Sequence, residues 1–153
     1  GLPLVAECGG LLLLGEQLAD GEGQLQPMAG VLPFQARKGA LSLGYRTATA
    51  TANGLLVRPG ESFCGHEFHR WQLEPVAAGG GLWQLDGWGT ATRSEGWTAP
   101  NVHASWLHLH WAGCPVIPSR LAAAAARAAP LPTSAASCSP TSPGPRSSKS
   151  AGV

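Results

Sequence analysis

The hydrophobic pattern at the start of the chain predicts a strand, a tight turn and a helix. Residues 1–7 form a short apolar segment typical of a buried parallel strand. Cys8-Gly9-Gly10 interrupts it, and the apolar run of residues 11–18 has the length of a helix. Gly15 lies inside that run and weakens the helix by about 1 kcal/mol relative to alanine. A cysteine therefore stands where the predicted strand meets the predicted helix.

From residue 28 to residue 111 the pattern changes to that of short strands. Glycine and proline recur at short intervals, and the runs between them are rich in β-branched or aromatic residues. We expect strands at residues 41–50, 64–73, 82–85 and 102–111. The six tryptophans indicate packing between sheet faces and loops. The sequence thus predicts an α/β protein whose second half is rich in strands.

The amino-acid composition changes again after about residue 118. Residues 121–129 have the alanine content of a final helix, whereas residues 130–153 are rich in proline, serine and threonine and contain no aromatic residue. Such a segment has too little apolar surface to offset the entropy cost of ordering. We expect one domain over residues 1–117, a terminal helix within residues 118–129 and a disordered tail over residues 130–153.

Charge and cysteine content narrow the classes of function. The net charge of +1 gives no electrostatic reason to expect nucleic acid or an anionic membrane as a partner. No apolar stretch approaches the roughly 18 to 20 residues that span a bilayer, and no basic region precedes the first apolar run as in a secretory signal. The four cysteines form no CxxC pair, which favours reduced thiols. We expect a soluble, cytoplasmic protein.

The first candidate for chemistry is the turn Ala6-Glu7-Cys8-Gly9-Gly10. A cysteine at a strand-to-helix turn is exposed at a sheet edge, and the glycines beside it let a substrate approach the backbone. The N–H groups that begin the helix favour thiolate over thiol, and those of Gly9 and Gly10 are candidates to hold an oxyanion. From the turn alone, a small buried residue at a strand–helix junction explains Cys8 equally well.

The second candidate is the histidine-rich stretch NVHASWLHLHW at residues 101–111. If it is one strand, alternation places Trp106, His108 and His110 on one face and the residues between them on the other. Two histidines at i and i+2 can serve as a base and its neighbour or as two metal ligands. A histidine held only by hydrogen bonds remains the simpler interpretation.

The third candidate is Gly65-His66-Glu67-Phe68-His69. On a strand, Glu67 and His69 share one face, where they are placed to orient a catalytic partner or a bound ammonium group. A polar edge strand is the alternative. The sequence contains neither GxxxxGK[ST] nor a GxGxxG that opens a helix, so we expect this chain itself to bind no ATP.

Five segments, taken in order, resemble the glutaminase domain of the cobyrinate a,c-diamide synthase family of cobalamin biosynthesis. They are AECGGLLLLGE at residues 6–16, PMAGVLP at 27–33, LGYR at 43–46, GHEFHRW at 65–71 and NVHASWLHLHW at 101–111. The likeness covers roughly residues 1–117, and the combination is far more specific than any one segment. It implies part of a class I glutamine amidotransferase domain with a flavodoxin-like α/β core.

The resemblance also implies roles for individual residues. Cys8 matches the family's nucleophile, and His108 matches the histidine of its aromatic-x-His pattern. In the wider class a glutamate stands two residues after that histidine, where this chain has His110. The resemblance therefore implies a cysteine–histidine dyad with no metal, beside which Glu67 and His69 stand as supporting candidates.

The implied reaction is the release of ammonia from glutamine through a cysteine thioester. A synthetase domain, in cis or in trans, would bind ATP and Mg²⁺ and use the ammonia to amidate the a and c carboxylates of cobyrinate. That domain and the family's upstream oxyanion loop are not in this sequence, so we expect an N-terminally truncated glutaminase that binds no cofactor of its own.

Three alternatives remain open from the sequence. The first is the glutaminase domain of cobyric acid synthase, which acts on other carboxylates. The second is an inactive fragment that folds poorly without its partner domain. The third is a β-rich metal-binding module that uses His108, His110 and either His66 or His69, although it leaves the cysteine turn unexplained.

The tail allows a first test. Deleting residues 130–153 should leave the Tm nearly unchanged, because the segment has few apolar side chains to bury. Thermal unfolding of the full and shortened chains, followed by circular dichroism, measures this. A drop of several degrees would contradict the prediction.

Overall fold

The computed structural model describes residues 1–75 and 81–128, which form two sheets and two α-helices. The smaller sheet has the order β1-β9-β8, with β1 (Leu4–Glu7) parallel to β9 (Val102–Ser105) and β8 (Trp97–Ala99) antiparallel to it. The predicted first strand is therefore present and runs beside the histidine-rich stretch. Its register pairs Glu7 with Ser105.

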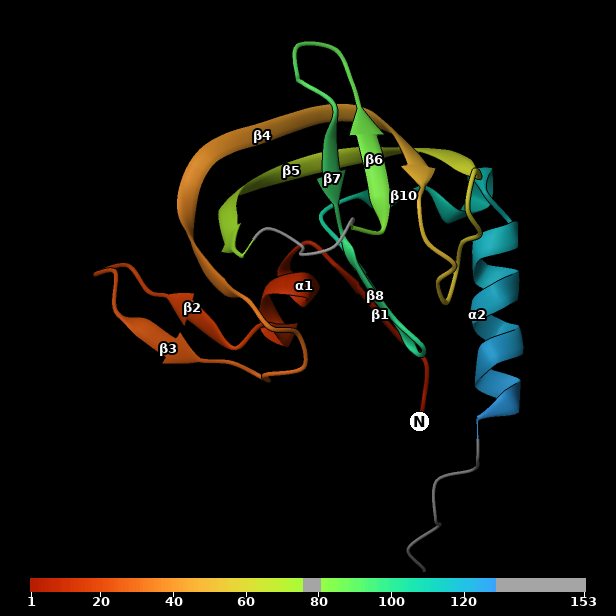
Figure 1. Ribbon diagram of the computed structural model, residues 1–153, viewed down its shortest axis with the longest axis horizontal. Helices are drawn as coiled ribbons and strands as arrows, with labels where there is room; N and C mark the ends of the chain where they lie inside the picture. The colour runs from red at the N-terminus through yellow and green to blue at the C-terminus, as the bar shows by residue number, and fades with distance from the viewer. Residues whose placement is uncertain (76–80, 129–153) are drawn as a thin grey trace, which may run out of the picture.

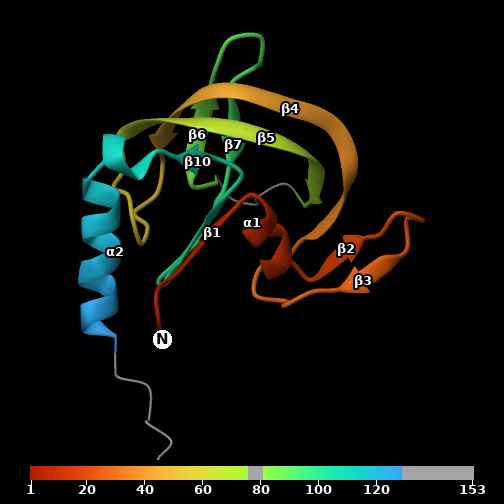
Figure 2. The ribbon, with the colours of Figure 1, turned by 180° about the vertical axis from the view of Figure 1, so that it is seen from behind.

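The larger sheet is built on one long antiparallel ribbon. Its strands are β2 (Gln17–Ala19), β3 (Leu25–Pro27), β4 (Gln35–Ala50), β5 (Ser62–Glu74), β6 (Trp83–Asp86), β7 (Arg93–Glu95) and β10 (His108–Leu109). The ribbon of β4 and β5 curves over the first sheet (Figures 1 and 2). Between Lys38 and Ser42 the register shifts, and such a bulge bends a strand. The predicted α/β fold with a strand-rich second half is confirmed.

The first helix is shorter than the sequence predicts. The apolar run of residues 11–18 was expected to be helical, but α1 (Gly9–Leu14) ends at Gly15, and residues 17–19 belong to β2. Gly15 has an extended backbone with φ −64° and ψ 173°, and a Cβ atom there would overlap the ring of Phe34. The helix therefore ends at a position where a residue without a Cβ atom is needed to pass the ring.

The chain after β10 continues through a 3₁₀ turn, η1 (Trp111–Gly113), into α2 (Val116–Arg127). This helix begins two residues before the region where the sequence predicts it. Ile117 is buried and joins the core of the larger sheet, and Arg120 pairs with both carboxylate oxygens of Glu61. The predicted disordered tail lies outside the described residues.

Two apolar clusters hold the sheets and helices together. One lies under β4 and β6 and contains Leu56, Leu82, Trp83, Leu85, Leu107 and Ile117, among others. The other joins α1 to both sheets and contains Leu11, Leu14, Phe34, Ala36, Ala104 and Trp106, among others. The second cluster fixes the start of α1, and thus Cys8, against β4 and β9.

The histidine-rich stretch is two strands rather than the one that the sequence predicts. The chain leaves β9 after Ser105 and enters β10 of the other sheet at His108. The predicted alternation is therefore wrong beyond Ser105: Trp106 is buried, His108 is partly exposed and His110 is exposed at the start of η1.

A buried carboxylate, that of Glu95, stabilises this crossing between the sheets. It accepts hydrogen bonds from the Ser105 hydroxyl (2.7 Å) and from the backbone N–H of Trp106 (2.8 Å). The Ser105 hydroxyl oxygen in turn accepts the N–H of Leu107 and the indole N–H of Trp83. The backbone groups freed by ending β9 are thus satisfied inside the protein, as buried polar groups require.

Burial shifts two titratable groups near this crossing in opposite senses. Burial raises the pKa of Glu95 to about 7, although the hydrogen bonds from Trp106 and Ser105 lower it. Burial lowers the pKa of His103 to about 4. His103 lies on β9 with its ring against Trp83, and its Nδ1 atom has no hydrogen-bond partner among the described residues.

The pKa of Glu95 predicts how stability depends on pH. Because its folded-state pKa of about 7 exceeds its ordinary value of 4.5, the folded protein holds the proton more tightly, and stability falls as pH rises through this range. A shift of this size corresponds to on the order of 3 kcal/mol. Glu95→Gln should remove the fall in the free energy of unfolding, measured by urea denaturation from pH 4.5 to 8.

His103 provides a control, because its effect on stability depends on pH in the opposite direction to that of Glu95. Its folded-state pKa of about 4 lies below the ordinary 6.5, so it stabilises the protein at neutral pH and that contribution is lost as pH falls toward 4. His103→Phe should flatten the acid side of the profile and leave the fall toward pH 7 in place. A Glu95→Gln profile parallel to that of the unaltered protein would contradict the assignment.

The end of α1 gives a further test. Gly15→Ala should destabilise the protein by about 1–3 kcal/mol, because the added methyl group overlaps the buried Phe34 ring. Gly21→Ala is the matched control, since a Cβ atom there meets nothing within 4 Å. Its effect on the free energy of unfolding should stay within about 0.5 kcal/mol, and equal effects of the two changes would exclude the clash with Phe34.

Candidate active site

Cys8 has a strained backbone at the junction of β1 and α1. Its φ of 50° and ψ of −110° make it the one non-glycine residue with positive φ in the described part of the chain. Such a conformation costs about 1–3 kcal/mol and persists only where the surroundings enforce it. Here the Cys8 N–H donates to the Ser105 carbonyl (3.0 Å), and the Cys8 carbonyl accepts the N–H of Leu12 (3.3 Å). The sharp turn expected from the sequence is present.

The Cys8 thiol lies at the edge of β5. Its sulfur is 3.7 Å from the carbonyl oxygen of Phe68, the hydrogen bond that the structure gives it. Phe68 follows His66 by two residues, and His66 is the register partner of His108 on β10. Two residues of extended strand span about 7 Å. The thiol and His108 therefore meet the same section of β5, although they are a hundred residues apart in the sequence.

His108 also approaches the strand that ends in the cysteine. Its Nδ1 atom is 3.9 Å from the carboxylate of Glu7, the residue before Cys8. The side chain of His108 is 43% exposed and that of Glu7 is 27% exposed, so both are partly open to solvent. The structure thus brings the cysteine turn and His108 together.

Gly9 and Gly10 are the first two residues of α1, so their N–H groups have no partner within the helix. A Cβ atom at Gly9 would meet nothing within 4 Å, which leaves open space beside the thiol. His110 does not share this place. It is exposed, and at the start of η1 its carbonyl oxygen accepts a hydrogen bond from the thiol of Cys114 (3.1 Å).

Glu67 and His69 share a face of β5, as the sequence predicts, and contact each other. The Glu67 side chain is fully buried and accepts hydrogen bonds from His69 (2.9 Å), Arg46 (2.9 Å) and Arg93. Burial alone raises the pKa of Glu67, but the bonds from His69 and Arg93 outweigh it and hold the pKa well below its ordinary range. Glu67 is therefore a permanent buried anion.

Neither arginine of this cluster is predicted by the sequence pattern. Arg46 is part of the quoted LGYR segment but was assigned no role, and no pattern in the surrounding residues marks Arg93. Alternation placed Glu67 and His69 on one face but did not say that this face is buried, and only a buried carboxylate needs a cation.

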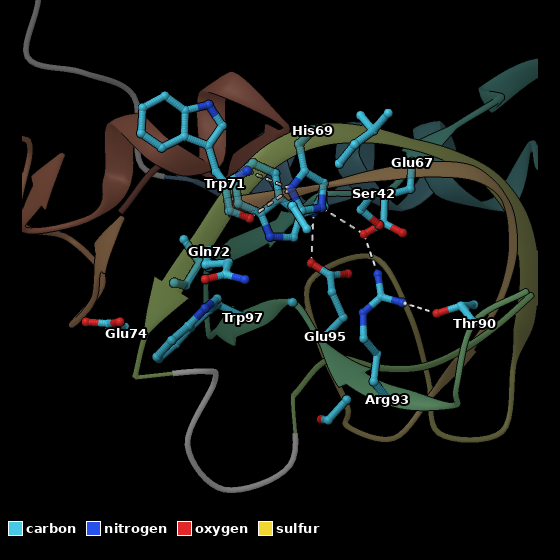
Figure 3. A pocket seen from close by; sticks show the side chains of 16 residues that line it. Ser42, Glu67, His69, Trp71, Gln72, Glu74, Thr90, Arg93, Glu95 and Trp97 are labelled. Atoms are coloured by element: carbon cyan, nitrogen blue, oxygen red, sulfur yellow. Dashed lines mark hydrogen bonds and ion pairs between the residues drawn. The ribbon is translucent and has the colours of Figure 1, made fainter. Parts of the chain in front are cut away.

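Glu67, His69 and Arg93 line a pocket of about 530 Å³ between β4, β5, β7 and β8. Figure 3 shows Arg93 reaching toward Glu67, with Thr90 on its other side and the indoles of Trp71 and Trp97 along the wall. The His69 ring stacks on Trp106 with centroids 4.0 Å apart and planes 11° from parallel. Neither Cys8 nor His108 lines this pocket. The predicted supporting pair therefore lines this pocket and contacts Trp106 through His69.

The metal-binding alternative is not supported by the grouping of its histidines. Both ring nitrogens of His69 are engaged, one with Glu67 and one with the Trp71 carbonyl (3.0 Å). Within residues 1–75 and 81–128, no three His, Cys, Asp or Glu side chains are placed to hold a metal ion. None of the helices described is long and apolar enough to cross a membrane.

Comparison with known proteins shows the family of the chain. Residues 1–115 match the family of CobB/CobQ-like glutamine amidotransferase domains. The chain is 49% identical over 112 residues to the cobyrinate a,c-diamide synthase of Gloeobacter violaceus, an alignment that covers 72% of this chain and 24% of that protein. Identity to the Synechococcus enzyme of the same name is 45% over 118 residues, with 75% and 25% covered.

A third relative is the hydrogenobyrinate a,c-diamide synthase of Streptomyces coelicolor, which is 43% identical over 121 residues, with 78% of this chain and 24% of the relative covered. The chain thus spans about a quarter of the length of the curated relatives it matches. The resemblance noted from the sequence is confirmed. This α/β chain is part of a class I glutamine amidotransferase domain and belongs to the CobB/CobQ-like glutamine amidotransferase family.

Proposed function

We propose that this chain is the glutaminase part of an ATP-dependent cobyrinate a,c-diamide synthase, with Cys8 as the nucleophile and His108 as its base. The observation that carries the proposal is the positive φ of Cys8 at the end of β1, because it presents the thiol at a strained turn that the surrounding hydrogen bonds enforce. The approach of His108 to the residue before Cys8 supports the pairing.

In the first step His108 takes the proton of the Cys8 thiol, and the thiolate attacks the side-chain amide carbon of glutamine. The carbonyl oxygen becomes an oxyanion, to which the N–H groups of Gly9 and Gly10 are free to donate. The open space beside Gly9 supports this assignment, since a substrate must approach the backbone closely there.

In the second step His108 returns the proton to the amide nitrogen, the C–N bond breaks and ammonia leaves. The product is a thioester between Cys8 and the glutamyl group. Water then attacks the thioester carbon with His108 as general base, which releases glutamate and restores the thiol. One glutamine and one water thus give one glutamate and one ammonia.

The ammonia would be used by a synthetase domain in cis or in trans. The residues of this chain do not fit ATP and Mg²⁺: the sequence has no phosphate loop, and the described residues bring together no group of carboxylates for a metal. We propose that the glutaminase unit ends near residue 117, that the synthetase domain binds ATP and cobyrinate, and that full activity requires both.

The identity of the corrin substrate rests on the relatives alone. Two of them are named for cobyrinate at 49% and 45% identity, which favours it over hydrogenobyrinate, named for a relative at 43%. These names also favour a,c-diamide formation over the cobyric acid synthase alternative.

We assign Glu67 and His69 a supporting role. The anionic Glu67 fixes one ring nitrogen of His69, whose stacked ring packs on Trp106, two residues before His108. The pair therefore restrains the segment that delivers the base without touching the reacting atoms.

Cys8→Ser tests the nucleophile. Combined with its synthetase domain and oxyanion loop, the protein should release ammonia from glutamine, and Cys8→Ser should abolish that release, because a serine hydroxyl is far less acidic than a thiol. The variant should still form amide product from free ammonia, since carboxylate activation takes place in the other domain. Glutamate release and amide formation, assayed separately, measure the two.

The histidines distinguish the mechanism from its rivals. His108→Ala should behave like Cys8→Ser but keep a residual rate, whereas the exposed His110→Ala should be much milder because no proton transfer uses it. Equal damage from both changes, with zinc present in stoichiometric amount by metal analysis, would replace this proposal with the metal-binding module.

A further inference from the structure

His108 has an acidic neighbour that the sequence pattern did not suggest. The Glu7 carboxylate is 3.9 Å from its Nδ1 atom, the ion pair that the described structure gives this histidine. The position two residues after His108, where the wider class carries a glutamate, is His110, which is exposed. The carboxylate therefore reaches His108 from the strand that precedes the nucleophile rather than from its own segment.

The topology explains how Glu7 arrives there. β1 and β9 are parallel, and their register places Glu7 opposite Ser105. The chain turns out of the sheet at Trp106 and Leu107, held by the bonds to Glu95 and Ser105, and His108 follows at once. A single turn at the end of β9 thus brings the histidine back beside the end of β1.

We propose that Glu7 is the positioning residue of His108, an inference that rests on the proposed function. Its carboxylate receives the Nδ1–H of the imidazole and so selects the tautomer whose Nε2 takes the Cys8 proton. It also stabilises the imidazolium that forms once the proton has moved. The third member that the motif lacks is thereby supplied by the residue next to the nucleophile.

The distance between the Glu7 carboxylate and His108 Nδ1 is that of a loose ion pair rather than a hydrogen bond. At 3.9 Å the two atoms are about 1 Å beyond a hydrogen bond. Hydrogen bonds of catalytic groups are often long in the ligand-free state and shorten when substrate binds. Both side chains are partly exposed, so neither is enclosed by the core.

Other titratable groups surround the pair and must be separated from it. His66 on β5 is the register partner of His108, and its ring lies against Tyr45 with centroids 5.4 Å apart. Cys114, between η1 and α2, is close enough that Glu7 raises its pKa, after the larger effect of burial. Cys8 and the exposed His110 are the other titratable groups near the pair.

The first experiment compares Glu7→Gln, Glu7→Asp and Glu22→Gln in the glutaminase assay with the synthetase domain present. Glu22 is an exposed glutamate in the turn between β2 and β3, so its change is the matched control. Values of kcat and KM for glutamine are measured from pH 5.5 to 9. Cys114→Ala is included to remove the other group that Glu7 influences.

Glu7→Gln should lower kcat by about tenfold with KM changed less than about twofold, a part of the roughly 10²- to 10⁴-fold contribution of general acid–base catalysis. The acid limb of its kcat/KM profile should move to lower pH, because no carboxylate then stabilises the imidazolium. Glu7→Asp should keep the limb and regain part of kcat. Glu22→Gln and Cys114→Ala should behave like the unaltered protein.

Two results would overturn the inference while leaving the proposed function intact. One is a Glu7→Gln enzyme with unchanged kcat and pH profile although Cys8→Ser and His108→Ala abolish hydrolysis. The other is a rise in KM alone, which would make Glu7 a substrate contact. Hydrolysis that survives Cys8→Ser would instead refute the proposed function itself.

A second measurement uses this chain alone and needs no turnover. Iodoacetamide alkylates thiolates, so its rate at Cys8, followed by peptide mass spectrometry, reports how well the imidazolium supports the thiolate. At pH 6 to 7, Glu7→Gln should slow alkylation of Cys8 several-fold and leave the exposed Cys64 unchanged as an internal reference. Equal rates at Cys8 in the two proteins would contradict the positioning role.

Discussion

The carboxylate of Glu95 stabilises the point where the chain crosses from one sheet to the other, and the geometry of the candidate active site depends on that crossing. Its hydrogen bonds with Ser105 and the Trp106 N–H let β9 end after four residues without leaving buried backbone groups unpaired. The turn sends His108 to the edge of β5, beside Glu7. Because burial raises the pKa of Glu95 to about 7, the same group links the stability of this crossing to pH.

Different groups of the candidate site lie on the two sides of β5. On the edge facing β10, the Phe68 carbonyl meets the Cys8 thiol, and His108 lies two residues away in register. On the opposite side a buried network fixes Glu67 as an anion with two arginines and His69. Trp106 connects them, because His69 stacks on it just before the chain reaches His108. A buried charged network thus packs, through Trp106, just before His108, which is partly open to solvent.

Several features follow from the sequence for local physical reasons. The strand before Cys8, the sharp turn at the glycines and the shared face of Glu67 and His69 depend on patterns that span only a few residues. The predicted extent of α1 was wrong. The helix ends at Gly15, which passes close to the Phe34 ring, nineteen residues away in the sequence, and the local pattern does not reveal that contact. The disordered tail over residues 130–153 stays a prediction.

By itself, the sequence determined the strand–turn–helix around Cys8, the strand-rich second half and the family, because periodicity, turn residues and quoted segments are local properties. The tertiary structure alone decided that residues 102–109 belong to two sheets, that Arg46 and Arg93 neutralise Glu67, and that Glu7 faces His108. The alternation of polar and apolar residues cannot show where the chain leaves one sheet for the other. The buried carboxylate of Glu95, which stabilises this crossing, comes from a separate strand. The strand register and the crossing between the sheets determine which charged side chains meet. The spacing of residues along one segment predicts neither of them.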